Sequence, residues 1–196
     1  MRTPKSMALV AVAGALLLWS GAPVAQTQDL PLRLTAFAVN MSNMGRGGAN
    51  TVLITIDRWS TDEEREQLMT AFIEKGPGAL LSQLQKMKRI GYMRLPNSLG
   101  YDLQFAREVE SEDGGRRIII ATDRRIGFQE ARNQPRTIDY PFTITEIRLD
   151  KNGVGQGKMS IATKITYNKK TKTVELENYS SEPVRLTQVK AEGKKK

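Results

Sequence analysis

Hydrophobic and polar residues alternate along most of the chain. In residues 101–110, for example, Tyr101, Leu103, Phe105 and Val109 fall on one face of an extended segment, and the positions between them are mostly polar. This alternation is typical of antiparallel strands that bury one face and expose the other. Strands are predicted over residues 32–40, 51–59, 90–95, 101–110, 116–123, 141–149, 157–167, 172–179 and 183–189.

The period of the pattern changes to that of a helix between residues 60 and 89. The apolar stripes are Leu68, Met69, Phe72 and Ile73 in a first helix and Leu80, Leu81, Leu84 and Met87 in a second helix that begins at Pro77. Either Ser60 with Glu63 or Thr61 with Glu64 can form a capping box at the start of the first helix. We therefore expect a helical hairpin whose apolar faces cover the end or the side of a sheet.

Together these elements predict a single β-rich domain at residues 26–190. Its fold class is α+β, mainly β: an antiparallel sandwich or an up-and-down barrel, with an αα-hairpin inserted at about residues 60–89. The glycine-rich stretch at residues 153–157 is predicted to be a hairpin turn, because a phosphate-binding loop would have to lead into a helix. Residues 191–196 end in three lysines and are predicted to be a basic disordered tail.

The N-terminus has the layout of a secretory signal peptide. Arg2 and Lys5 precede an apolar run at residues 7–19, and small residues with a proline follow it. We expect residues 1–25 to be removed by cleavage after Ala25, with Ala22 as the alternative site and an uncleaved anchor as the alternative to cleavage. The mature protein would then be periplasmic or extracellular.

The composition excludes most of the common catalytic chemistries. The chain has no histidine and no cysteine, so it can build neither Ser-His-Asp nor Cys-His systems, nor zinc or copper sites based on imidazole or thiolate. The acidic cluster at residues 108–115 is better explained as a solvated hairpin tip than as a calcium site. We expect no metal and no cofactor.

The net charge points to anionic partners. Removing the signal peptide lowers the formal charge from +9 to +7, because Arg2 and Lys5 are lost with it. This excess suits an anionic small molecule, a glycan, an acidic protein partner or a membrane surface that is contacted without being spanned. Nucleic acid would suit the charge equally well, but export argues against it.

The strand predicted at residues 116–123 is apolar on both faces. Ile118 and Ile120 share one face, and Ile119 and Ala121 share the other. We expect this strand to be central, with the sheet's core on one side and the helical hairpin on the other. The chain then leaves the sheet at Asp123 for a long connection.

This arginine-dense connection, residues 123–140, is the candidate binding segment. Connections of this length without regular structure are often functional, and arginine can donate two parallel hydrogen bonds to a carboxylate or phosphate. Arg107 is a further candidate, since it falls on an apolar face where a cation must pair, reach solvent or meet an anion. The candidate ligand-binding residues are Arg107, Arg124, Arg125, Arg132, Arg136, Asp139 and Tyr140.

A plainer explanation of the connection is internal ion pairing. Asp123, Glu130 and Asp139 could neutralise three of the four arginines and fasten the segment to the sheet. The hypothesis that follows from the sequence is an exported, non-enzymatic binding module. The alternatives are a structural protein of a cell-surface complex and a hydrolase that uses two carboxylates, drawn from Glu108, Glu110, Asp139 and Glu146.

Overall fold

The computed structural model describes residues 30–39, 49–76, 78–95, 100–111, 114–124, 126, 142–160, 164–168, 173–177 and 184–192. The predicted signal peptide therefore lies outside the described residues. The large sheet contains β1 (Leu32–Val39), β2 (Ala49–Ile56), β3 (Gly91–Arg94), β4 (Tyr101–Leu103), β5 (Phe105–Glu110), β6 (Arg116–Ala121), β7 (Ile144–Leu149), β8 (Val154–Ser160) and β11 (Val184–Ala191). The remaining elements are the helices α1 (Asp62–Lys75) and α2 (Gly78–Leu84) and the two-stranded hairpin of β9 (Lys164–Asn168) and β10 (Thr173–Glu177).

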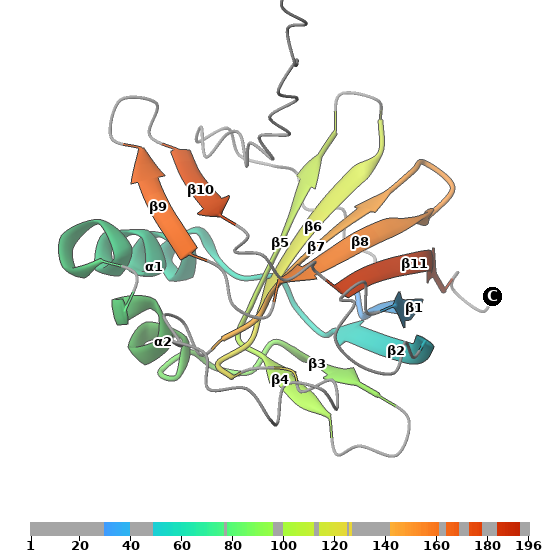
Figure 1. The fold of residues 1–196 in the computed structure, drawn as a ribbon, viewed down its shortest axis with the longest axis horizontal. Coiled ribbons are helices and arrows are strands. Elements are labelled where there is room, and N and C mark those ends of the chain that lie inside the picture. The colour runs from blue at the N-terminus through green and yellow to red at the C-terminus, as the bar shows by residue number, and fades with distance from the viewer. Residues whose placement is uncertain are drawn as a thin grey trace, which may run out of the picture.

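The large sheet is a nearly closed antiparallel barrel. Its strand order is β4-β3-β2-β1-β11-β8-β7-β6-β5, and every neighbouring pair is antiparallel. The two strands at the ends of this order, β4 and β5, are consecutive in the chain and are separated only by Gln104. The sheet therefore curls back on itself, and the choice between sandwich and barrel is decided in favour of the barrel. Figure 1 shows α1 and α2 on one side of the strands and β1, β2 and β11 on the other.

The predicted fold class, mainly β with an inserted helical hairpin, is confirmed. Two separate cores hold it together. The first fills the barrel with apolar side chains from all nine strands, including Leu34, Ile54 and Ile147. The second lies between the hairpin and the outside of the barrel, where Leu68, Phe72 and Leu84 meet Phe105, Ala121 and Phe142.

The strand β6 joins the two cores as predicted. Ile118 and Ile120 belong to the barrel interior. On the opposite face Ala121 belongs to the core under the helices. The prediction that this strand has apolar partners on both faces, with the helical hairpin on one of them, is confirmed.

The first helix starts at the second of the two predicted capping boxes. Thr61 is the N-cap, its hydroxyl accepts from the amide of Glu64, and the carboxylate of Glu64 accepts from the amide of Thr61. Ser60 has a different role, because its hydroxyl accepts a hydrogen bond of 3.1 Å from the amide of Ala106 in β5. The predicted apolar stripe is wrong at Ile73, whose side chain is 47% exposed: α2 packs against the Leu68–Phe72 side of α1 and does not cover it.

Two strand predictions are wrong because the chain changes partners. Leu103 and Phe105 were expected on one face, but Leu103 lies inside the barrel and Phe105 lies in the core under the helices. At Gln104 the chain stops pairing with β3 and starts pairing with β6, so the alternation is reset there. Similarly, the predicted strand 157–167 consists of β8, which begins earlier, at Val154, and β9, which pairs with β10 in a separate sheet.

The hairpin turn expected at residues 153–157 lies earlier in the chain and shares only Gly153 with that range. The turn itself is Asp150–Gly153, where the carboxylate of Asp150 accepts from the amides of Asn152 and Val154. Gly155 and Gly157 belong to β8. A Cβ on Gly155 would lie 1.8 Å from the carbonyl oxygen of Arg148 in β7, so the glycine permits close approach of two strands.

Candidate functional site

Arg107 is used to fasten the first helix to the barrel. It lies on the outer face of β5, where its side chain is only 11% exposed, and its Nη1 donates to Oδ1 of Asp62 at 2.7 Å. Asp62 is the first residue of α1, where a carboxylate also interacts favourably with the helix dipole. The sequence left three possibilities for Arg107: an ion pair, contact with solvent, or contact with an anionic ligand. The structure shows the ion pair.

A second arginine lies close to this ion pair. Burial, followed by the nearby charge of Arg107, lowers the pKa of Arg65 on α1, and the carboxylate of Asp62 acts in the opposite direction. Arg65 therefore feels both the cation of Arg107 and the carboxylate of Asp62 where α1 meets β5. The lowered pKa shows that this position disfavours the charged form of Arg65, so it is the ion pair of Arg107 with Asp62 that joins helix and barrel.

The arginine-dense connection leaves and re-enters the barrel through a hydrogen-bonded stem. Thr122 follows β6 and Thr143 precedes β7, and both side chains are buried. The amide of Thr122 donates to the carbonyl of Thr143 at 3.0 Å, and the amide of Thr143 donates to the hydroxyl of Thr122 at 3.2 Å. The two ends of the connection are therefore held side by side.

Further contacts fix the first residues of the connection. The amide of Asp123 donates to Oε1 of Gln104, and the amide of Ile126 donates to the hydroxyl of Thr143, both at 3.0 Å. The side chain of Ile126 is fully buried in the barrel core. Just before it, Arg124 is exposed, and its guanidinium lies 5.4 Å from the centre of the Tyr101 ring. Arg124 is thus presented at the end of the barrel, on the stem.

The other predicted ligand-binding residues belong to the rest of the connection. Arg125, Arg132, Arg136, Asp139 and Tyr140 lie outside the described residues. Both explanations of the connection, anion binding and internal ion pairing, remain hypotheses for these positions. The structure describes the stem of the connection, formed by Thr122 and Thr143.

Two of the four carboxylates considered for hydrolysis lie on opposite faces of the sheet. Glu108 is buried on the face that also carries Ile118 and Ile147, with Arg116 at 3.7 Å. Glu146 lies on the outer face, where it accepts from Arg117 at 3.0 Å and from Arg148 at 2.8 Å. These two acids therefore do not form a catalytic pair across one cleft.

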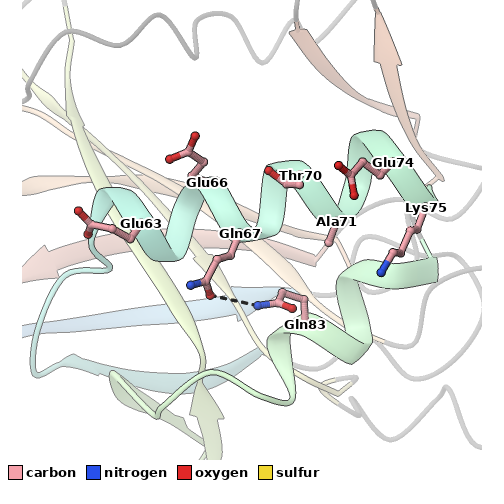
Figure 2. A pocket seen from close by; sticks show the side chains of 8 residues that line it. All are labelled: Glu63, Glu66, Gln67, Thr70, Ala71, Glu74, Lys75 and Gln83. Carbon is pink, nitrogen blue, oxygen red and sulfur yellow. Dashed lines mark hydrogen bonds between the residues drawn. The ribbon is translucent and has the colours of Figure 1, made fainter.

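A shallow hollow runs along the helical hairpin. Figure 2 shows that Gln67 of α1 and Gln83 of α2 point toward one another, and Nε2 of Gln83 donates to Oε1 of Gln67 at 3.2 Å. Glu66 points away from α2. In the part of the chain that the structure describes, no group of three or more acidic side chains is arranged to hold a metal ion. The hollow offers no catalytic constellation.

The outer surface of β11, β1, β2 and β3 carries a feature that sequence reasoning missed. Two large apolar side chains, Phe37 and Leu53, are 41% and 43% exposed there. The alternation of these strands shows that they lie outside the barrel, but only the pairing register shows that they are neighbours.

The chain matches no family model, no curated protein and no solved structure. Neither α1 nor α2, the helices of the described residues, has the length and hydropathy needed to cross a membrane. Any functional conclusion has to come from the geometry itself.

Proposed function

We propose that this protein is an exported, non-catalytic binding module that presents the arginine-dense connection from a rigid barrel to an anionic partner. The observation that supports this function is the stem of Thr122 and Thr143, reinforced by the buried side chain of Ile126. A long connection with a fixed base is a common arrangement for binding segments, because the scaffold limits the entropy lost when the segment binds.

The chemistry of the segment selects the class of partner. Arginine remains charged at any physiological pH, and its planar group matches carboxylate, phosphate or sulfate oxygens. The partner would be an anionic small molecule, an envelope glycan or an acidic protein outside the cytoplasm. Arg107 does not belong to this binding set, because it is committed to Asp62 in α1.

The test is heparin-affinity chromatography, with heparin as a model polyanionic glycan. A variant with Arg125→Ala, Arg132→Ala and Arg136→Ala should elute at clearly lower salt than the unmodified chain. Each arginine that binds an anionic group should contribute at least about tenfold in affinity, because hydrogen bonds to charged groups contribute about 1.5–3 kcal/mol.

The matched control removes the same three charges elsewhere. The triple variant Lys194→Ala, Lys195→Ala and Lys196→Ala should elute near the unmodified chain. Equal shifts for the two triple variants would show that net charge alone drives retention, and the proposal would be wrong. Circular dichroism melting curves confirm that both variants are folded.

A further inference from the structure

The exposed apolar residues Phe37 and Leu53 form the centre of a continuous outer surface. In the β1–β2 register Phe37 is opposite Thr51, and Leu53 is opposite Thr35, so the two large side chains are diagonal neighbours. The threonines around them are short, so the phenyl and isobutyl groups project above their surroundings.

Four cations surround this apolar centre. Lys190 of β11 is opposite Thr35, and Arg94 of β3 is opposite Leu53. Arg185 is opposite Val39, and Arg33 lies on the same outer face of β1. We call these residues the basic face: Arg33, Phe37, Leu53, Arg94, Arg185 and Lys190.

The charges of the basic face are not neutralised by its own strands. All four cations are exposed, and none forms an ion pair with a carboxylate among the described residues. The outward positions of β11, β1, β2 and β3 that the structure describes include no acid. Acids occur next to these strands in the chain: Asp29 lies four residues before Arg33, Glu182 lies three residues before Arg185, and Asp57 and Glu192 follow the ends of β2 and β11.

The geometry of this surface restricts its partner. β1 and β2 are already hydrogen-bonded on both edges, so no peptide strand can be added there. The surface is the outside of a barrel, and the hollow described above lies on the helices instead. Four adjacent strands span about 14 Å, which suits contact with a broad charged plane better than a grip on one small ligand.

We propose that the basic face docks the barrel peripherally on a lipid surface rich in anionic phospholipid headgroups. The four cations lie against the headgroup phosphates, and their long side chains can follow the surface. Phe37 and Leu53 enter the boundary between headgroups and acyl chains, as apolar side chains of interfacial proteins do. This binding site is separate from the arginine-dense connection and does not depend on it.

The experiment is co-sedimentation with vesicles at about 0.1 M salt, where charges interact over about 10 Å. The full chain should bind vesicles of phosphatidylcholine with phosphatidylglycerol more strongly than vesicles of phosphatidylcholine alone. Arg94→Gln with Arg185→Gln should weaken binding to the anionic vesicles about 30-fold, since each cation near such a surface contributes about fivefold. Phe37→Ser with Leu53→Ser should weaken it as well.

Control variants on the helical hairpin remove the same groups from another surface. Lys75→Gln with Lys86→Gln removes two exposed cations, and Ile73→Ser removes an apolar side chain that is 47% exposed. Both should bind like the unmodified chain. Residues 1–25, with their apolar run and the cations Arg2 and Lys5, are present in every variant, so their contribution is the same throughout and cancels in the comparison.

Several results would overturn the proposal. Equal weakening by the basic-face and hairpin variants would mean only general charge attraction. Full competition by millimolar glycerol phosphate would mean a site for a single phosphate group instead of a surface. Retention on heparin that depends on Arg94 and Arg185, without matching loss of vesicle binding, would assign the face to a glycan. Melting curves identify any variant that fails to fold, and single substitutions then replace the pair.

Discussion

Glu64 has three hydrogen-bonding contacts that link the start of α1 to the chain before it. Its two carboxylate oxygens each accept from the guanidinium of Arg58 at 2.8 Å, and one of them also accepts from the amide of Thr61 at 2.9 Å. The hydrogen bonds from Arg58, supported by that from Thr61, lower the pKa of Glu64 below its ordinary value of 4.5, although burial opposes the shift. A carboxylate with a lowered pKa stabilises the fold only while it is ionised.

The substitution Glu64→Gln should therefore have a pH-dependent effect. At pH 7 we expect a loss of about 1 kcal/mol in the free energy of unfolding, because the capping box and the ion pair both weaken. The stabilising contribution is complete above the unfolded pKa and disappears as the pH falls through the folded pKa. The difference between variant and parent should thus shrink below about pH 4.5, as measured by urea unfolding at several pH values.

Glu74→Gln is the matched control, because it removes an exposed carboxylate from the other end of α1. Its effect should stay within about 0.5 kcal/mol at every pH. A Glu64→Gln difference that remained constant down to pH 3 would contradict the assignment. At this scale the sequence already predicted Thr61 with Glu64 as one of two capping boxes. The sequence could not choose between the two boxes. The hydroxyl of Ser60 accepts a hydrogen bond from the amide of Ala106, and this contact between distant residues is not visible in the local pattern.

At the scale of the elements, the strand β11 departs from the regular alternation of inward and outward side chains. The strand β11 contains an extra residue between Leu186 and Val189, where the register with β8 shifts and Gln188 has a φ of 49°. This bulge allows Leu186 and Val189, three positions apart, both to point into the barrel. A strict period of two predicts opposite faces for them. The bulge also turns Lys190 outward, onto the basic face.

The strands β7 and β8 approach each other closely at Gly155. Gly155→Ala should cost at least about 1–3 kcal/mol of stability, because the new Cβ would collide with the backbone of Arg148 and the strands would have to separate. Chemical denaturation followed by circular dichroism measures the loss.

Gly78→Ala provides the comparison. A Cβ at this position in α2 meets nothing within 4 Å, and alanine favours a helix, so the variant should be neutral or slightly stabilised. If Gly155→Ala were as stable as Gly78→Ala, the close packing of β7 on β8 would be wrong.

At the scale of the whole molecule, the start of the connection is part of the barrel core. Ile126 belongs to the arginine-dense connection in sequence, yet its side chain is fully buried in the core made by the strands. The base of the arginine-dense connection is thus coupled to the stability of the barrel core.

Ile126→Ala should lower the free energy of unfolding by about 2–5 kcal/mol, the usual cost of a cavity left by a large aliphatic side chain. The control Ile73→Ala, at an exposed position of α1, should change it by less than about 0.5 kcal/mol. Urea unfolding monitored by circular dichroism distinguishes them. Equal effects would mean that Ile126 does not anchor the connection in the core.

The sequence by itself determined the secondary structure classes, the mainly β fold and the place of the helical hairpin. These features follow from the spacing of apolar residues within single elements, such as Ile118 and Ile120 or Leu68 and Phe72, and that spacing is readable locally. It also indicated the arginine-dense connection from its length and composition.

Only the tertiary structure decided that the sheet closes into a barrel, that Arg107 pairs with Asp62, and that Thr122 and Thr143 hold the connection. It alone revealed the basic face, because Phe37, Leu53, Arg94 and Lys190 become neighbours only through the registers of four strands. Each of these features depends on contacts between residues distant in the chain, and pairing across strands, not alternation within them, sets those contacts.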